Sequence, residues 1–591
     1  MKHYLLIALA LLSSWGFSQN AEVPLPKGLT EQERQELSTY SFSSEGVRGT
    51  TTPPQGNLRL MAEWEETDYL LVAWVNNYAN TITAIVEAAV EECKVLMVVR
   101  PNDYNTMITT LANAGISMDS IEVIQRNVNS VWIRDYAANP VYKDWNDSLI
   151  LVDWIYNRPR PDDNSVSTAH SDYLNIPLYQ MTVAPTDVVA TGGNYMGDGF
   201  SNAFSSNLIL DENGPGNGFG VTAKSEQDLD QIYQNFMGID TYIKMTNLPY
   251  DDIHHIDMHM KLLDEETLLV SEYPAGVADG PQIEANLQYV LSNFTSTYGT
   301  PYRVIRIPSP PSTGGLYPDN GGYYRTYANQ VFVNNTVIVP FYREEWDTIA
   351  QRILEEAMPG YNIVGVNVDA ASGEQLIAAS GAIHCITHSI GVQDPLIISH
   401  QRLEDTNDNL NDYVVHAYIS HRSDIQSARL YYKIGATGTY QQVTMTNVAG
   451  EDWQGLIPAQ QGEVDIYYYI QATANSGKTG NRPMPAPDGY WKFTVFGDGT
   501  ANTDEFEIDV PAIYPNPASA TTVIPFDGKL GEFGKIELID ASGRIVKTIH
   551  EGAFELGVHN FFIDASAFAS GSYTVKYRSN YRVSNQRIII L

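Results

Sequence analysis

Cys385 is one of two cysteines in the 591-residue chain, and it follows His384 and precedes His388 in the segment GAIHCITH at 381–388. A free thiol has a pKa of about 8.5, and a nearby imidazolium or cationic substrate lowers it towards the reactive thiolate. The alternatives are a buried structural cysteine or a disulfide with Cys93. Apolar residues at helical spacing in 80–99 predict a helix whose buried face includes Cys93. Cys385 is then the unpaired thiol.

Three further segments carry residues that could work with this thiol. Asp135 lies in the run 131–136, His255 and Asp257 lie in 253–259, and Asn329 is the last residue of 323–329. Two carboxylates can each accept paired N–H donors from a guanidinium. A thiolate can attack the central carbon of that group while an imidazole protonates the departing ammonia. The set therefore suits attack on a cationic planar group.

Asp135, His255 and Asp257 also have simpler interpretations. Asp135 could form an ordinary ion pair with Arg134. If 253–263 is a strand, His255, Asp257 and His259 share one face, where they could bind zinc or include a buried His–Asp pair. No further ligand cluster is evident in the sequence, so a metal site is not favoured.

Arg158 and Arg160 lie two residues apart in the proline-stiffened segment 156–163. They should project to roughly the same side and could clamp a carboxylate. The alternative is a surface loop in which they pair with Asp162 and Asp163. The glycine-containing stretch 191–199 lacks the spacing and the helix of a phosphate loop, which excludes nucleotide binding.

Capping residues and periodicity predict five units in which a helix precedes a strand, across roughly 60–395. The last four lead into the polar segments above, which suggests a closed, pseudo-symmetric α/β ring with a central site. Ser225, Pro281 and Asp347 are the predicted N-terminal signals of three helices. The helix and strand ranges are 80–93 with 94–99, 106–114 with 121–124, 225–236 with 240–245, 281–294 with 302–307, and 348–358 with 363–368.

The sequence before and after these five units has other patterns. Residues 1–18 have the basic start, apolar run and small residues of a signal peptide, and no later run approaches the roughly 20 apolar residues of a membrane span. The alternating short strands of 395–497 predict an immunoglobulin-like sandwich, followed by a linker at 498–509 and a smaller β domain at 510–591.

With 35 basic and 70 acidic residues the net charge is −35, which argues against nucleic acid or anionic membrane as partners. The acidic surface fits cationic substrates and solubility equally well.

Several motifs, in this order, resemble the Porphyromonas-type peptidylarginine deiminases of the agmatine deiminase branch of the guanidino-group-modifying superfamily. They are WIRDY at 132–136, YNRPR at 156–160, TGGNYM at 191–196, HID at 255–257, Asn329 and HCITH at 384–388. The resemblance implies a five-bladed α/β propeller as a catalytic domain at 49–394. It also implies conversion of arginine to citrulline and ammonia through a covalent thiouronium intermediate, without metal or other cofactor.

The same resemblance assigns roles to residues of this chain. It makes Cys385 the nucleophile and His255 the general acid and later the base. Asp135 and Asp257 hold the guanidinium, Asn329 supports the site, and Trp132 packs on the substrate. Arg158 and Arg160 match a pair associated with the α-carboxylate of a C-terminal arginine, which favours peptide substrates over agmatine.

The tail resembles a second family, the C-terminal sorting domain of type IX secretion. The matching stretches are IYPNPA at 513–518, LIDASGR at 538–544 and ASGSYT at 569–574. This implies export across the outer membrane by the type IX machinery, followed by release or attachment to the cell surface. Residues 19–48 are a candidate pro-segment.

The leading hypothesis is a secreted protein-arginine deiminase acting on peptidyl, favourably C-terminal, arginine. One alternative is a deiminase of a small guanidine such as agmatine or free arginine. A second is a non-catalytic surface protein that binds through the immunoglobulin-like domain. In either deiminase, Asp135 and Asp257 should oppose a thiolate at Cys385 until a cation enters the site.

Overall fold

The computed structural model describes residues 24–37, 39–40, 42, 49–369, 373–496, 511–529, 532–579 and 583–591. The predicted signal peptide at 1–18 and the predicted linker at 498–509 lie outside the described residues. The predicted pro-segment at 19–48 is described only in part, and that part includes the short helix α1 (Glu31–Glu36).

Four sheets of the region between residues 50 and 391 share one plan, an antiparallel strand pair followed by a parallel strand. The antiparallel pairs are β5–β6, β9–β10, β12–β13 and β15–β16, and the parallel strands are β7, β11, β14 and β17. The strands are β5 (Asn139–Lys143), β6 (Ser148–Tyr156), β7 (Leu178–Met181), β9 (Met196–Gly197), β10 (Asn202–Ser206), β11 (Thr241–Met245), β12 (Met260–Leu262), β13 (Thr267–Glu272), β14 (Arg303–Pro308), β15 (Val331–Val333), β16 (Thr336–Phe341) and β17 (Asn362–Asn367). The short strands β1 (Leu58–Leu60) and β8 (Val189–Ala190) extend the first of these sheets at β5 and β6.

The fifth sheet joins the two ends of this region. Its parallel strands are β2 (Thr67–Trp74), β3 (Lys94–Val99) and β4 (Ile121–Gln125), and its antiparallel strand is β18 (Thr387–Gly391). The segment that carries Cys385 therefore enters a sheet whose other strands come from the start of the region.

Helices make the crossovers between the parallel strands. The main ones are α2 (Ala79–Ala89), α3 (Tyr104–Asn113), α6 (Val166–Leu174), α8 (Glu226–Met237), α9 (Gly280–Asn293) and α10 (Glu344–Ala357). In α8, Ser225 caps the helix as predicted and forms a capping box with Asp228, and Gly238 ends the helix in the left-handed conformation. One face of the helix is buried and includes Leu229, Ile232, Tyr233 and Phe236, the spacing of an amphipathic helix.

Three local predictions were wrong. Helix α10 begins at Glu344, and Asp347 does not cap it but lies buried inside its first turn, where it accepts hydrogen bonds from Tyr342 N and the Tyr327 hydroxyl, both at 2.8 Å. Acidic residues are favourable both at a cap and in the first turn, so the sequence does not tell which of these two positions Asp347 takes.

The second error concerns Cys93. Helix α2 ends at Ala89, so Cys93 follows the helix and lies half-buried against the core.

The third error concerns which segments form the five units. Helix α3 and strand β4 extend the sheet that contains β3, so they are not a unit of their own. The sheet of β5, β6 and β7 was not counted at all. The described strands form five separate sheets in this region and no closed one. The five-bladed propeller remains a prediction.

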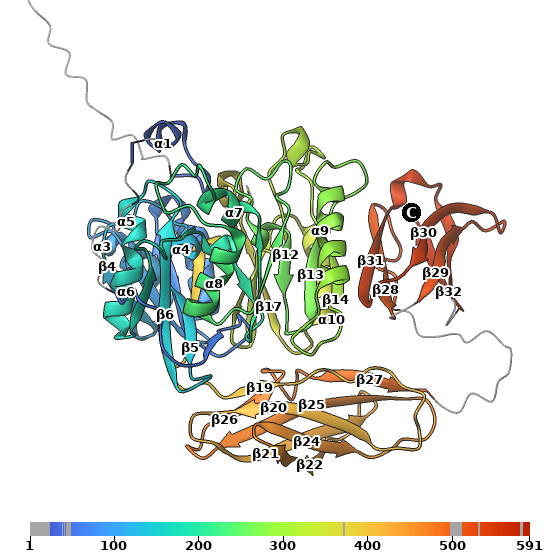
Figure 1. Ribbon diagram of the computed structural model, residues 1–591. Coiled ribbons are helices and arrows are strands. Elements are labelled where there is room, and N and C mark those ends of the chain that lie inside the picture. The colour runs from blue at the N-terminus through green and yellow to red at the C-terminus, as the bar shows by residue number, and fades with distance from the viewer. Residues whose placement is uncertain are drawn as a thin grey trace, which may run out of the picture.

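Two β-rich bodies follow, below and to the right in Figure 1. In the first, two antiparallel sheets share a core that includes Val415, Leu430 and Ile470; its immunoglobulin-like identity remains a prediction. Its strands are β19 (Ile397–Ser399), β20 (Tyr413–Ser420), β21 (Ile425–Ile434), β22 (Gln441–Thr444), β23 (Thr446–Ala449), β24 (Asp452–Ile457), β25 (Val464–Ala474), β26 (Thr479–Arg482) and β27 (Trp491–Val495). The second body contains β28 (Thr521–Gly528), β29 (Phe533–Ile539), β30 (Ile545–Ala553), β31 (Gly557–Asp564), β32 (Gly571–Ser579) and β33 (Val583–Ile590).

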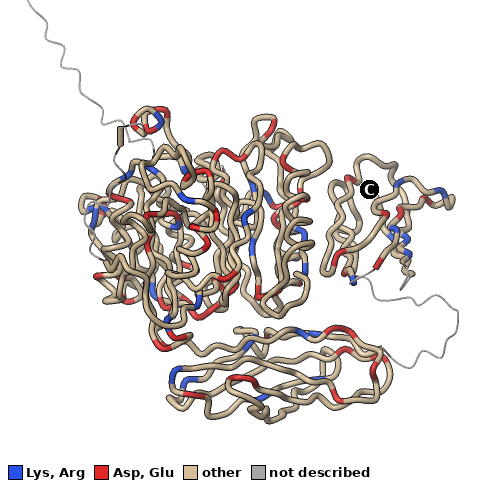
Figure 2. Tube along the Cα trace, viewed as in Figure 1, with Lys and Arg blue, Asp and Glu red and all other residues tan. Residues whose placement is uncertain are grey.

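Acidic positions are spread over all three bodies and do not gather at one place (Figure 2). This distribution favours solubility, more than attraction of a cationic partner to one surface, as the reason for the net charge. Among the described residues, no helix is long and apolar enough to cross a membrane.

Candidate active site

The predicted site residues come together because each lies just before the antiparallel strand of its own sheet. Asp135 is in the short helix α4 (Ile133–Tyr136) before β5, and Asp257 is in a 3₁₀ turn (Ile256–Met258) before β12. Asn329 precedes β15, and Cys385 is in a 3₁₀ turn (His384–Ile386) before β18. The repeated plan of the sheets thus delivers polar side chains to one buried place.

The thiol of Cys385 is completely buried and is held by an amide. Asn329 Nδ2 lies 3.1 Å from Cys385 Sγ, and Asn329 Oδ1 accepts a hydrogen bond from His384 N at 3.0 Å. The sulfur is also 3.6 Å from Asp257 Oδ2. Asn329 therefore fixes both the sulfur and the backbone that carries it.

The histidines that flank Cys385 face away from it. In the described structure, neither imidazole hydrogen-bonds the sulfur. His384 Nδ1 lies 2.8 Å from Asp257 Oδ2 and its Nε2 lies 2.5 Å from Glu63 Oε1, while His388 Nε2 donates to Ala138 O at 3.0 Å. His384 thus positions Asp257 and does not activate the thiol directly.

Glu63 is a site residue that sequence reasoning missed. It is contacted by His384, Arg134 and Lys261, and Arg134 Nη1 lies 3.3 Å from Glu63 Oε1. The predicted alternative of an Arg134–Asp135 ion pair is therefore wrong, because Arg134 turns to Glu63. No local signal marked Glu63, since its partners come from distant segments of the chain.

Asp135 and His255 form the other side of the site. Asp135 Oδ1 accepts a hydrogen bond from Gly193 N at 3.1 Å and lies 3.7 Å from His255 Nδ1. His255 Nε2 lies 3.0 Å from Thr191 Oγ1. A Cβ atom on Gly193 would lie 2.4 Å from His255 Nδ1, so only glycine fits there. The glycine-containing stretch at 191–199 is thus part of the site, and its glycine pair was the available signal.

The interpretation of 253–263 as one strand is wrong, and the alternation argument for His255, Asp257 and His259 fails with it. His255 precedes the 3₁₀ turn, Asp257 is within it, and β12 begins only at Met260. In the part of the chain that the structure describes, no group of three or more His, Cys, Asp or Glu side chains is arranged to hold a metal ion.

The centre of the site holds Lys27, which sequence reasoning did not place there. Its completely buried Nζ lies 2.7 Å from Cys385 Sγ, 3.7 Å from Asp257 Oδ2 and 3.9 Å from Asp135 Oδ1. Burial lowers the pKa of Lys27, but the charges of Asp135 and Asp257 outweigh burial and raise it above its ordinary value. An ammonium therefore lies between the thiol and the two carboxylates.

The backbone on both sides of Lys27 is bound by predicted site residues. Trp132 Nε1 donates to Leu25 O at 3.0 Å, and Arg158 Nε donates to Lys27 O at 3.1 Å. Arg160 Nη2 donates to Pro26 O at 2.8 Å and to Gly28 O at 3.1 Å.

The arginine pair is part of the site and not of a surface loop. Arg158 and Arg160 are 7% and 1% exposed, so the alternative of a loop with Asp162 and Asp163 as partners is wrong. Arg160 Nε instead donates to Glu33 Oε1 at 2.7 Å. Both side chains contact the N-terminal segment, so they project to the same side as predicted.

The protonation of the site follows from burial and charge. Burial, with the charge of Asp257, raises the pKa of Cys385 to about 12, although Lys27 opposes this shift. Burial would raise the pKa of Asp257, but the charge of Lys27 and the hydrogen bond from His384 hold it below its usual range. Burial, with the charge of Lys27, holds the pKa of His255 well below its usual value. The site at neutral pH therefore contains a thiol, an Asp257 carboxylate and a neutral His255.

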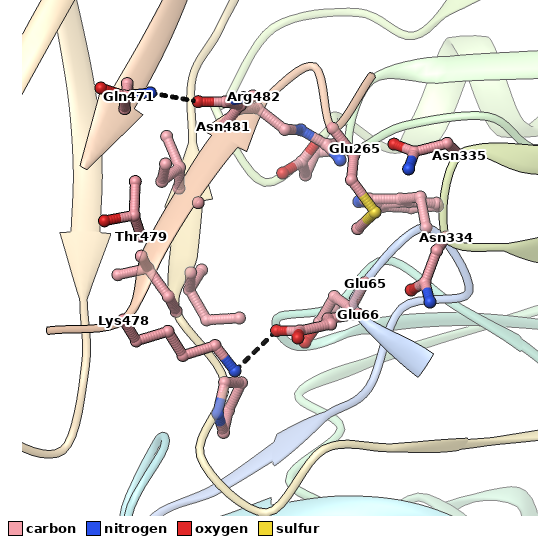
Figure 3. A pocket seen from close by; sticks show the side chains of 18 of the residues that line it. Glu65, Glu66, Glu265, Asn334, Asn335, Gln471, Lys478, Thr479, Asn481 and Arg482 are labelled. Carbon is pink, nitrogen blue, oxygen red and sulfur yellow. Dashed lines mark hydrogen bonds and ion pairs between the residues drawn. The ribbon is translucent and has the colours of Figure 1, made fainter. Parts of the chain in front are cut away.

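A cavity of about 370 Å³ lies elsewhere, between this region and the β19–β27 body (Figure 3). Its wall includes the ion pairs Lys478–Glu66 at 2.7 Å and Arg482–Glu265 at 2.9 Å. It contains no thiol and no histidine. This cavity belongs to the interface between the two bodies and has none of the chemistry gathered around Cys385.

Comparison with known proteins gives two family matches. Residues 59–390 match the model of the Porphyromonas-type peptidyl-arginine deiminases, and residues 512–591 match the secretion system C-terminal sorting domain. Agmatine deiminase from Pseudomonas syringae is 23% identical over 304 residues, covering 47% of this chain and 78% of that protein.

Two solved structures are similar in the same region. Agmatine deiminase of Enterococcus faecalis has a TM-score of 0.49 and 18% identity, covering 59% of this chain and 99% of that one. Agmatine deiminase of C. jejuni has a TM-score of 0.45 and 22% identity, covering 57% of this chain and 96% of that one.

Proposed function

The chain belongs to the Porphyromonas-type peptidyl-arginine deiminase family, and we propose that it converts peptidyl arginine to citrulline and ammonia. Its C-terminal sorting domain directs it to the cell surface or the medium through the secretion machinery that reads this domain. We place the catalytic domain at 49–394, as a five-bladed propeller, the immunoglobulin-like domain at 395–497, and the sorting domain at 510–591.

The observation that carries the proposal is a buried cation held between a thiol and two carboxylates. The Lys27 ammonium occupies the position where the resemblance requires a guanidinium. Among the described residues, Asp257 Oδ1 and His255 Nδ1 have no hydrogen-bond partner. A guanidinium carries more N–H donors than an ammonium and could satisfy such a free carboxylate oxygen.

The proposed chemistry uses these groups in sequence. Entry of the substrate cation lowers the pKa of Cys385, the thiol proton passes to the neutral His255, and the sulfur attacks the guanidinium carbon. Ammonia leaves with a proton delivered by His255, which then deprotonates the water that releases citrulline and the thiol. Asp135 and Asp257 hold the guanidinium through both steps.

Peptide substrates are favoured over agmatine by the contacts of Arg158 and Arg160. Arg158 donates to the main-chain carbonyl of the residue whose side chain enters the site, and Arg160 donates to the carbonyls of both neighbouring residues. Agmatine has no oxygen at that place. A C-terminal arginine would present a carboxylate to two buried guanidinium groups, so we propose that C-terminal arginine is the better substrate.

The test measures citrulline from a peptide ending in arginine, from the same arginine placed internally, and from agmatine. Because Lys27 fills the site, the chain should be assayed intact and after cutting at a protease site introduced between residues 42 and 49. We expect the C-terminal peptide to react fastest and Cys385→Ala to lower kcat by roughly 10⁴-fold or more. Turnover of agmatine alone would contradict the peptide proposal, and full activity of Cys385→Ala would contradict the nucleophile.

A further inference from the structure

Lys27 lies in the site as the side chain of a substrate would lie. We propose that residues 24–37 are an intramolecular pseudosubstrate that keeps the deiminase inactive until the segment is displaced. This inference rests on the proposed function and adds its regulation.

The first argument is the position of one atom. Lysine Nζ and arginine Cζ are reached through the same number of bonds from Cα. Lys27 Nζ, 2.7 Å from Cys385 Sγ, therefore lies where the carbon of an arginine in the same conformation would face the nucleophile. This distance is shorter than the roughly 3–3.5 Å that separates reacting atoms in a near-attack geometry, so the position is close enough to Sγ for attack. The segment is thus docked in the register of a substrate.

The second argument is chemical inertness. A lysine ammonium satisfies the charge requirement of Asp135 and Asp257. It carries no electrophilic carbon for Sγ and no nitrogen that can depart as ammonia. Lys27 can therefore occupy the site indefinitely without being consumed, which is the property of an inhibitor.

The third argument is that the segment is bound along its length. Glu33 is buried and pairs with Arg160, and it also forms a capping box with Thr30 that orders helix α1. Lys27 N donates to Ala379 O at 2.9 Å. Charged groups are seldom buried without partners. The paired and buried charges along this segment therefore indicate a specific interaction with the deiminase region. Helix α1 lies at the top of the view in Figure 1, over the α/β region.

Glu33 gives the segment a second point of competition with substrate. It engages the guanidinium of Arg160, one of the two cations proposed to bind a substrate carboxylate. The segment therefore fills both the guanidinium position and part of the carboxylate position. A substrate cannot enter either while the segment is docked.

The sharpest test turns the pseudosubstrate into a substrate. In the Lys27→Arg chain, the thiol proton of Cys385 should pass to His255 and Sγ should bond to Cζ of the new arginine. One terminal C–N bond should then break to release ammonia, which takes that proton from His255. Water then adds to Cζ, the C–S bond breaks, and a ureido group remains. Mass spectrometry of the purified full chain should find citrulline at position 27.

Three controls belong to this experiment. The double variant Lys27→Arg with Cys385→Ala should keep its arginine. Arg34, exposed in the same segment, reports modification by other molecules. Lys244→Arg is a matched control, since Lys244 of β11 is also buried but pairs with Asp230 of helix α8, away from Cys385. Arginine retained at position 27 in a chain that is active after cutting would overturn the inference.

The second test measures release. Tethering gives a docked segment an effective concentration of about millimolar, so cutting between residues 42 and 49 and removing the fragment should raise kcat/KM at least about tenfold. A synthetic peptide of residues 24–37 should then inhibit competitively, and its Lys27→Ala form should inhibit at least about tenfold less. Equal activity of cut and uncut chains, or equal inhibition by the two peptides, would overturn the pseudosubstrate. A cut chain that produces no citrulline from any substrate would instead overturn the proposed function.

Discussion

The two ends of the described chain both dock on the deiminase region, but they do so in different ways. The N-terminal segment buries Lys27 and Glu33 against site residues. The sorting domain packs on the outside, where Val304 N donates to Leu556 O at 2.9 Å, Asn560 Nδ2 donates to Arg306 O at 2.8 Å, and Arg352 lies 3.6 Å over the ring of Tyr514. Figure 1 shows this body beside β14 and α9, on a different side from α1.

The difference indicates which end controls chemistry. The N-terminal contacts reach the thiol, both carboxylates and the arginine pair, so displacing that segment must change the site. The C-terminal contacts reach an outer strand and two helices and leave the site untouched. We therefore expect the first end to regulate activity and the second to direct export alone.

The largest expected effect concerns alkylation of Cys385, measured in a Cys93→Ser background. Because the pKa of Cys385 is raised to about 12, the thiolate fraction should grow about tenfold per pH unit between pH 7 and 10 without a plateau. Mass spectrometry after timed reaction with iodoacetamide measures this rate. A plateau near pH 8 to 9 would contradict the raised pKa.

The same measurement distinguishes the two ends. Cutting between residues 42 and 49, with removal of the fragment, should make a cationic haloacetamidine react faster than neutral iodoacetamide, because Asp135 and Asp257 would then attract the cation. Cutting between residues 497 and 510 should change neither rate. Equal sensitivity of the thiol to both cuts would contradict the comparison.

Arg158→Ala should have the next largest effect, assayed in the chain cut after residue 42. Loss of a buried charge-assisted hydrogen bond to the substrate carboxylate should lower kcat/KM for a C-terminal arginine peptide by roughly 10²-fold. Turnover of agmatine, however small, should change less than about twofold, because agmatine has no carboxylate. A parallel loss on both substrates would assign Arg158 to the guanidinium position or to stability.

Glu33→Gln should raise the activity of the uncut chain by roughly tenfold. Glutamine keeps the capping box but loses the charge that pairs with Arg160, so the segment should dock less tightly. Glu36→Gln, on the exposed side of the same helix, is the matched control and should change activity little. Kinetics of both variants before and after cutting measure the effect, and equal activation by the two would contradict a specific role for Glu33.

Removal of the sorting domain should have the smallest effect. Cutting between residues 497 and 510 and separating the fragment should leave kcat/KM within about twofold, since the contacts named above between this body and the deiminase region do not include the site residues. Steady-state kinetics of the two forms measure this. A large loss of activity would show that the C-terminal end also reaches the chemistry.

The sequence by itself determined much of the fold and which side chains are candidates for the reacting groups. The crossover helices other than α6 were predicted from periodicity, except at boundaries such as Asp347, where an acidic residue suits both a cap and a first turn. Cys385, Asp257, His255, Asp135 and Asn329 were found because thiols, carboxylates, imidazoles and amides carry distinctive chemistry. Recurring order along the chain indicated that they converge.

Only the tertiary structure decided what these groups touch. Lys27 and Cys385 are 358 residues apart, and Glu63 and His384 are 321 apart, so no local pattern links either pair. The strand expected at 253–263 was replaced by a 3₁₀ turn because the chain must turn His255 and Asp257 into the centre before β12 begins. A sequence states which chemistry a side chain has, whereas burial and long-range packing decide which partner it meets and which charge it carries.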